Sequence, residues 1–141
     1  IITQNIDDLH ERAGSKNIIH LHGEIMKSRS CVTNKIFPIN GTEIHEKDLC
    51  PEGYPLRPHV VWFGENVPNM PVAINILNEA DILVIIGTSL QVYPAASLIH
   101  ETKPKCLRFI IDPNDITVPG DVIHIKKTGS VGIKDFFELI K

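Results

Sequence analysis

The chain of 141 residues is long enough for one compact domain with its own core and too short for two. Hydrophobic residues make up 43% and charged residues 22%, and the net charge of -3 comes from scattered side chains, which excludes a basic surface for nucleic acid. No apolar run approaches the ~18 residues that span a membrane. Three irregularly spaced cysteines argue against a secreted disulfide framework, so we expect a cytoplasmic protein.

Apolar runs rich in Ile and Val predict five buried strands, and Ile1-Ile2 is expected to end a sixth. The five are residues 18–21, 60–63, 82–86, 107–111 and 122–125. Helical spacing marks the segments 8–13, 72–80, 95–103 and 133–141. Strands that are apolar throughout and alternate with helices favour an α/β fold with a parallel sheet and helices on both faces.

Residues 27–57 interrupt this alternation, because they are polar, carry two cysteines and show little periodicity. We expect a small inserted module there rather than part of the sheet, which leaves residues 1–26 and 58–141 for the main domain. The chain does not begin with Met and opens as if in mid-strand. We therefore expect a fragment whose main domain is incomplete at its N-terminus.

Polar side chains follow two of the predicted strands. Asn5 and Asp7 could each cap the next helix, but a cap needs only one residue and leaves Gln4 unexplained. Side chains that surround a polar ligand are an equally good interpretation. The second group, after residues 82–86, consists of Gly87, Thr88 and Ser89. It is compatible both with a plain loop and with a phosphate or ribose site.

His22 ends the strand predicted at 18–21, and His20 lies two residues earlier on the same side. A lone histidine is more often structural than catalytic. The strand end, followed by Gly23 that leaves room for a ligand, favours catalysis here. An imidazole near its usual pKa of ~6.5 can act as a general base at neutral pH.

Cys31 and Cys50 flank the inserted module, and a zinc ribbon would need each to open a C-x-x-C pair. Asn34 and Gly53 stand where the second cysteines should be, so two thiolates and His45 remain. Because structural zinc is almost always four-coordinate, we expect no zinc in the module.

The segment 57–65 combines a strand with bulky aromatic side chains and an abrupt glycine turn. Packing of Trp62 and Phe63 in the core is the structural interpretation. Alternatively, an open strand edge pairs with an extended peptide, and the aromatic side chains wall a narrow apolar channel.

Five separated motifs occur in the order found in sirtuins, and the match covers almost the whole chain. They are Thr3-Gln4-Asn5-Ile6-Asp7, His22-Gly23, the pair Cys31 and Cys50, Val61-Trp62-Phe63-Gly64-Glu65, and Gly87-Thr88-Ser89 with Val92 and Pro94. The chain thus resembles the larger C-terminal part of a sirtuin. Residues 56–65 are most similar to the bacterial and mitochondrial subgroup that includes desuccinylases.

The resemblance implies a Rossmann-like NAD-binding domain with a degenerate zinc module, and it implies site residues. His22 matches the catalytic base. NAD would be bound by Gln4, Asn5 and Asp7 at the nicotinamide and ribose, and by Gly87, Thr88 and Ser89 on the adenosine side. The acyl-lysine substrate would be bound by Val61, Trp62, Phe63, Gly64, Glu65 and Val92. The family often has Asn in the strand after the Gly-Thr-Ser loop, where Ile110 is aligned.

The implied function is an NAD-dependent protein-lysine deacylase that removes acetyl or succinyl groups, transfers them to ADP-ribose and releases nicotinamide. NAD is the co-substrate, and acylated-lysine proteins or peptides are the partners. A sirtuin-like ADP-ribosyltransferase or other NAD-consuming enzyme is the alternative, against which the retention of Val61, Phe63 and Glu65 argues. Because the family's Gly-rich opening segment is missing, we expect the fragment alone to be inactive.

Overall fold

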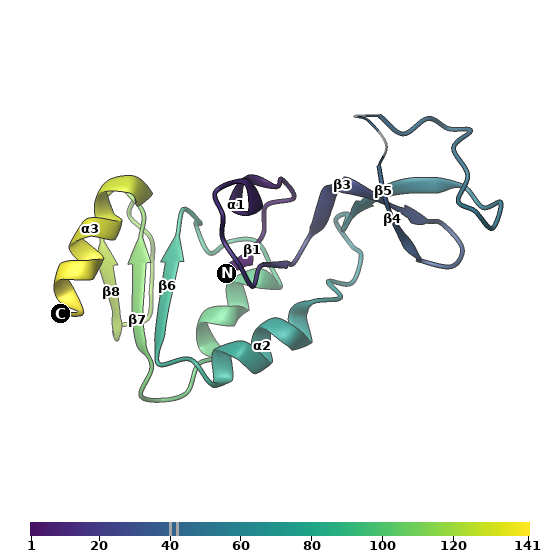
Figure 1. Cartoon of the computed structure of the whole chain (residues 1–141). Helices are drawn as coiled ribbons and strands as arrows, with labels where there is room; N and C mark the ends of the chain where they lie inside the picture. Colours follow the sequence, from purple (N-terminus) through teal and green to yellow (C-terminus); the bar gives the residue numbers. More distant parts are fainter. Residues whose placement is uncertain (40, 42) are drawn as a thin grey trace. The chain divides into compact units, whose positions relative to one another are not determined.

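The computed structural model describes residues 1–39, 41 and 43–141 (Figure 1). It divides into two compact units, Ile1–Asn69 and Met70–Lys141, and each is described by itself. Parallel and antiparallel sheets both occur, together with helices, so the expected α/β class is confirmed. None of the helices in these residues has the length and apolar character needed to cross a membrane.

The first unit opens with two short parallel strands, β1 (Ile2–Thr3) and β2 (Ile19–His20), connected through the single-turn helix α1 (Leu9–Arg12). Thr3 lies opposite His20, and the Thr3 carbonyl accepts a hydrogen bond from the amide of Leu21 at 2.9 Å. Thr3, His20 and Leu21 are all buried. The strand predicted at 18–21 and the helix predicted at 8–13 are thus confirmed in place.

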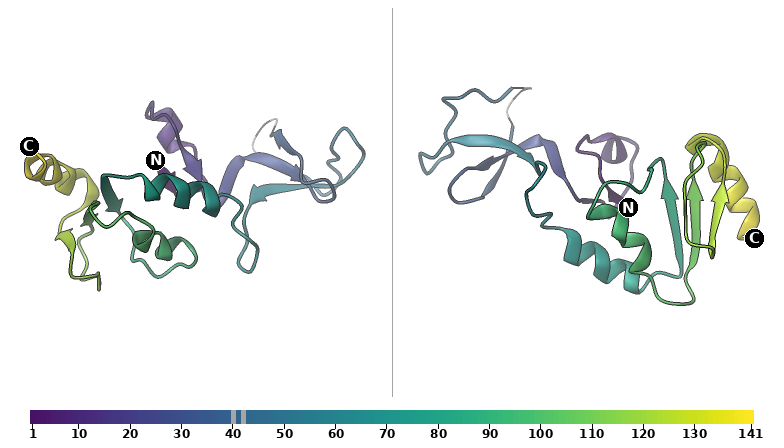
Figure 2. Two further views of the ribbon diagram at one scale, coloured as in Figure 1. Left: turned by 90° about the horizontal axis from the view of Figure 1, so that it is seen from below. Right: turned by 180° about the vertical axis from the view of Figure 1, so that it is seen from behind.

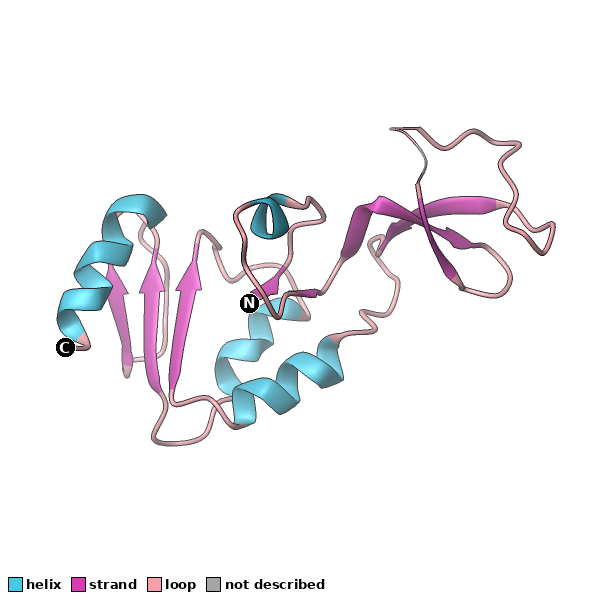
Figure 3. Ribbon diagram, in the orientation of Figure 1, coloured by secondary structure: helices cyan, strands magenta, loops and turns pink. Residues whose placement is uncertain are grey.

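An antiparallel sheet completes this unit, in the order β4-β3-β5 (Figure 3). Its strands are β3 (Gly23–Ser30), β4 (Ile36–Pro38) and β5 (Leu56–Val60). The expectation that residues 27–57 contain no sheet was wrong. β3 shows no apolar alternation because it carries polar and charged residues and a bulge between Glu24 and Ser28, and β4 is only three residues long. β5 also ends where the strand predicted at 60–63 begins; it accommodates Pro58 because it is an edge strand.

The second unit holds a three-stranded parallel sheet in the order β6-β7-β8. The strands β6 (Ile82–Ile86), β7 (Leu107–Ile111) and β8 (Val122–Ile125) have the bounds that the sequence predicted. The helical segments are α2 (Met70–Asn78), the 3-10 helix η1 (Ala95–His100) and α3 (Gly129–Leu139). α3 begins before the predicted 133–141 and includes Gly132. A glycine fits at this position because an added Cβ would lie 2.4 Å from the side chain of Ile111.

β7 is buried on both faces, as expected for the middle strand of a parallel sheet. On one face Phe109 and Ile111 pack with Phe136 of α3, whose ring meets that of Phe109 edge-on at a centroid distance of 5.0 Å. On the other face Ile110 packs with Ile99 of η1. The two views of Figure 2 show α3 beside β7 and β8. The sheet of this unit is thus covered by helices on both faces.

Gly23 and Gly14 provide a matched pair of variants. Both have left-handed backbone, with φ of +85° and +82°, but an added Cβ would lie 2.0 Å from the His59 carbonyl at Gly23 and would meet nothing within 4 Å at Gly14. A left-handed residue other than glycine costs roughly 1–2 kcal/mol. We expect Gly14→Ala to lower the free energy of unfolding by about that amount, and Gly23→Ala to cost several kcal/mol more. Urea denaturation measures both, and equal losses would contradict the packing of β3 on β5.

Candidate active site

Two histidines of the β2–β3 segment hold two successive carbonyls of the turn that follows β1. The Nδ1 atom of His22 lies 3.1 Å from the carbonyl oxygen of Gln4, and the Nδ1 atom of His20 lies 3.0 Å from that of Asn5. A carbonyl oxygen only accepts, so each Nδ1 atom must carry a hydrogen. The structure thus brings together Gln4, Asn5 and His22, which lie far apart in the sequence.

The chemical state of His22 follows from this contact. With the hydrogen on Nδ1, a neutral imidazole keeps its lone pair on Nε2, which is the form that a general base requires. The side chain is half-buried, and its backbone carbonyl accepts a hydrogen bond from the amide of Val61 at 2.9 Å. His22 therefore links the turn after β1 to the start of the segment predicted to bind substrate.

The side chains of this turn differ in their roles. The Oδ1 atom of Asp7 accepts a hydrogen bond from the amide of Leu9 at 3.1 Å in a turn just before α1, whose N-cap is Asp8 and makes no side-chain cap hydrogen bond. In the described part of the chain, no hydrogen bond engages the side-chain amide of Gln4 or of Asn5. The cap expected from Asn5 or Asp7 is therefore not formed, and the two amide groups are available to a ligand.

The residues after β5 form a tight turn rather than a strand. The amide of Glu65 donates to the carbonyl of Trp62 at 3.0 Å, and Gly64 has a φ of +88°, which this turn requires. Trp62 is 56% and Phe63 100% exposed, so the core-packing interpretation of the two aromatic side chains is wrong. The ring of Phe63 is therefore fully exposed to solvent at the tip of the turn.

The carboxylate of Glu65 stabilises this turn through hydrogen bonds. It accepts hydrogen bonds from the Trp62 amide at 3.0 Å, from Arg57 at 2.6 Å and from Arg29 at 3.3 Å. The Trp62 amide, followed by Arg57, lowers the pKa of Glu65. The sequence places Glu65 in the substrate segment but gives no sign of the two arginines, because only the pairing of β3 with β5 brings them to it.

In the second unit, Gly87 directly follows β6, and its amide donates to the carbonyl of Ile111 at the end of β7 at 3.2 Å. The hydroxyl of Thr88 accepts a hydrogen bond from the amide of Leu90 at 3.3 Å. Ser89 and Val92 are exposed. The loop therefore lies at the carboxyl ends of parallel strands, where such sheets bind ligands.

Asp112 is a candidate residue that the motifs of the sequence did not reveal. It is buried directly after β7, and its Oδ1 atom accepts hydrogen bonds from the amide and the side chain of Asn114, both at 2.9 Å. Ile110, which is aligned where the family often has Asn, is wholly buried in the core. An acidic residue at the end of an apolar strand is the signal that would have identified the position.

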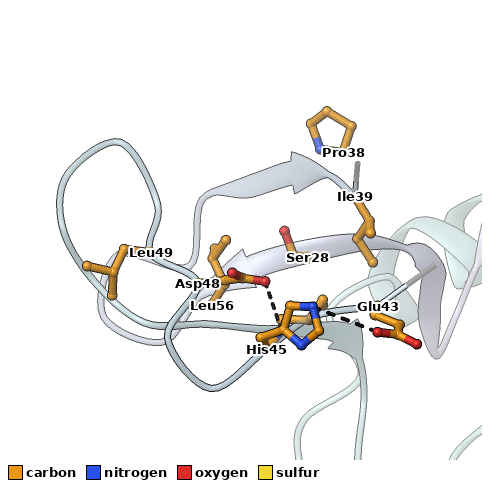
Figure 4. A pocket seen from close by; sticks show the side chains of 9 residues that line it. Ser28, Pro38, Ile39, Glu43, His45, Asp48, Leu49 and Leu56 are labelled. Carbon is orange, nitrogen blue, oxygen red and sulfur yellow. Dashed lines mark hydrogen bonds and ion pairs between the residues drawn. The ribbon is translucent and has the colours of Figure 1, made fainter. Parts of the chain in front are cut away.

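Cys31 is exposed and Cys50 is buried, and in the part of the chain that the structure describes they do not gather with His45. Among the described residues, the only group of three potential metal ligands consists of Glu11, His20 and Glu24. His20 is hydrogen-bonded through both ring nitrogens and offers no free lone pair. His45 instead lines an open cavity of about 520 Å³, where its amide donates to Asp48 at 2.8 Å (Figure 4).

The turn that follows Cys31 and the turn that follows Cys50 are joined by the carboxylate of Glu52. Glu52 accepts hydrogen bonds from the hydroxyl of Thr33 at 3.3 Å and from the ammonium group of Lys35. The Lys35 ammonium lowers the pKa of Glu52. The amide of Cys31 also donates to the carbonyl of Pro55 at 2.9 Å. We call Thr33, Lys35 and Glu52 the carboxylate clamp.

Comparison with known proteins finds relatives of similar sequence. A protein of Aggregatibacter actinomycetemcomitans named NAD-dependent protein deacylase is 51% identical over 119 residues, covering 83% of this chain and 56% of that protein. The protein of the same name from Bacteroides thetaiotaomicron is 43% identical over 154 residues, covering 99% of this chain and 63% of that protein. The chain thus spans a little over half of each of these relatives.

Solved structures are similar to this chain as well. A Sir2 homologue in complex with NAD superposes with a TM-score of 0.83 at 35% identity, over 99% of this chain and 59% of that one. Sir2Tm bound to a propionylated peptide gives 0.78 at 30% identity, over 97% of this chain and 62% of that one. Residues 1–94 match the model of the Sir2 family. From this match and these relatives, the chain belongs to the Sir2 family, the sirtuins.

Proposed function

We propose that this protein is an NAD-dependent protein-lysine deacylase that transfers an acetyl or succinyl group from lysine to ADP-ribose and releases nicotinamide. The observation that carries the proposal is His22, whose Nδ1 hydrogen is committed to the Gln4 carbonyl at 3.1 Å, so that Nε2 is the basic atom. The relatives named NAD-dependent protein deacylase support the reaction type. Sirtuins crystallised with NAD and with an acylated peptide support the two substrates.

In this proposal the turn after β1 binds the nicotinamide end of NAD. Gln4 and Asn5 offer amide groups that can donate to and accept from a carboxamide or a ribose hydroxyl. Asp7 accepts the hydrogen bond of the Leu9 amide on Oδ1, so Oδ2 is proposed to meet the carboxamide. NAD supplies the ribose carbon from which nicotinamide leaves.

His22 then takes the proton of a ribose hydroxyl on Nε2. The imidazolium that forms is stabilised by the Gln4 carbonyl, which already accepts the hydrogen bond from Nδ1 at 3.1 Å. The ring does not need to turn during the reaction, because the same contact serves both protonation states. A base held in this way contributes typically 10²–10⁴-fold to the rate.

The segment Val61 to Glu65 binds the acyl-lysine in the proposal. No hydrogen bond from a described residue engages the Val61 carbonyl, which is thus available to the amide of the substrate. The bare ring of Phe63 offers an apolar wall for the lysine stem, held in place by the Glu65 turn. Val92 is proposed, from the resemblance to sirtuins, to contact the bound peptide.

The adenosine end of NAD is proposed to bind at the loop of Gly87, Thr88 and Ser89. Asp112 follows the neighbouring strand, and its carboxylate suits a ribose diol. An acidic group at such a strand end favours NAD over NADP, because it repels a 2′-phosphate. We therefore include Asp112 among the proposed NAD-binding residues.

The variants His22→Ala and His22→Asn separate chemistry from structure. Asn keeps an N–H group that can donate to the Gln4 carbonyl but has no basic nitrogen, whereas Ala lacks both. In the full-length protein we expect both variants to lose deacylation by ~10²–10⁴-fold or more. His22→Asn should keep the melting temperature and NAD affinity of the wild type.

Nicotinamide release and O-acyl-ADP-ribose formation from an acetylated or succinylated peptide measure this effect. Turnover by either folded variant at the wild-type rate would contradict the role of His22. Nicotinamide release by the wild type without O-acyl-ADP-ribose would point to ADP-ribosyl transfer instead.

We also propose that the module between Cys31 and Cys50 is stable without zinc, because two of four thiolates are replaced and the carboxylate clamp joins the two turns. A chelator should leave the melting temperature unchanged, and elemental analysis should find no stoichiometric zinc. Glu52→Gln should lower the melting temperature slightly. Glu46→Gln, an exposed carboxylate without a partner in the described part of the module, should not. Close to one zinc per chain would overturn the proposal.

A further inference from the structure

We infer that His20 is a positioning residue for NAD: as an imidazolium paired with Glu11, it holds the Asn5 carbonyl and thereby keeps the turn after β1 in its ligand-binding form. The inference rests on the proposed function, since it assumes that this turn binds NAD. His20 touches neither the acyl-lysine segment nor the basic nitrogen of His22 in the contacts described above.

The geometry requires a doubly protonated ring. His20 is only 6% exposed, and its two nitrogens face acceptors, the Asn5 carbonyl at 3.0 Å from Nδ1 and the Glu11 Oε1 atom at 2.8 Å from Nε2. Neither a carbonyl nor an ionised carboxylate can donate, so both ring nitrogens must carry hydrogens. His22 differs from His20 because, among the described residues, such a partner faces its Nδ1 atom alone.

The charged groups around the ring favour this state. Burial lowers the pKa of His20, but the hydrogen bonds that the ring donates to Glu11 and Asn5 and the charges of Glu11 and Glu24 outweigh it, so that the pKa is raised above its ordinary value. The contact with His20 lowers the pKa of Glu11 in turn. Lys27 offsets part of the Glu24 charge, since its ammonium group binds the Glu24 carboxylate at 2.8 Å, so Glu11 is the main partner of the ring.

Loss of a proton at high pH would act on the Asn5 contact. A hydrogen bond to a carboxylate is stronger than one to a carbonyl, so neutral His20 keeps its hydrogen on Nε2, toward Glu11. The lone pair of Nδ1 then faces the lone pairs of the Asn5 oxygen, and the contact becomes repulsive. The hold on the turn is therefore complete below the ordinary histidine pKa of ~6.5 and is lost as the pH rises through the raised pKa of His20.

Glu11→Gln tests the inference because it removes the negative charge at position 11 and keeps a group there that can hydrogen-bond to His20. With a neutral amide in place of the carboxylate at position 11, neutral His20 can carry its hydrogen on Nδ1, toward Asn5, while Nε2 accepts from the new amide. The hold on Asn5 then persists at high pH. His20→Ala removes it at every pH.

The experiment measures the dissociation constant for NAD by calorimetry from pH 6 to 9 in the full-length wild type and both variants, with the His20 and Asn5 resonances followed by NMR. We expect affinity to fall about ten-fold through the His20 titration in the wild type, to stay flat in Glu11→Gln, and to be about ten-fold weaker throughout in His20→Ala. The kcat for deacylation at saturating NAD should change little in Glu11→Gln.

Equal pH slopes in wild type and Glu11→Gln, or unchanged affinity in His20→Ala, would overturn the inference. So would a His20 resonance that titrates below pH 6.5, or one whose titration leaves Asn5 unmoved. Absence of NAD binding by the wild type at any pH would instead refute the proposed function, and the coupled shift of Asn5 would still test the hold of His20 on the turn.

Discussion

The candidate site depends on one set of contacts, in which the carbonyls of residues 4–6 are all bound by residues 20–25, which run from the end of β2 into β3. The donors are the rings of His22 and His20 and, for Ile6, the amide of Ile25 at 2.7 Å. Polar backbone groups in such a turn need partners. Because two of the three partners are titratable rings, the shape of the turn and the protonation of the site are set by the same bonds.

This arrangement explains the two histidines at alternate positions of one chain segment. Both use Nδ1 on the turn, and they differ in what faces Nε2. Glu11 faces that atom in His20 and favours the charged ring, whereas among the described residues no partner binds the Nε2 atom of His22. The surroundings thus favour the cation in one imidazole and leave the other a nitrogen that can accept a proton.

The sequence predicted the parts of the fold in which side-chain chemistry is uniform along an element. β6, β7 and β8 have the predicted bounds because nearly every residue in them is apolar. β3 could not be found, because it is rich in polar and charged residues and its bulge breaks alternation. The predicted Gln4, Asn5 and His22 do meet, but their bonds use backbone carbonyls, which no residue type reveals. Likewise only the fold shows that Phe63 is bare and that Arg29 and Arg57 hold Glu65.

The carboxylate clamp responds to its surroundings differently from a thiolate–zinc centre. Four thiolates tie a module to the supply of metal and to a reducing medium, because oxidation of one ligand opens the site. The Lys35 and Glu52 side chains do not react with oxidants, but both are solvent-accessible, so dissolved salt weakens their attraction. The contact between Lys35 and Glu52 therefore loosens as ionic strength rises, whereas the supply of metal does not affect it.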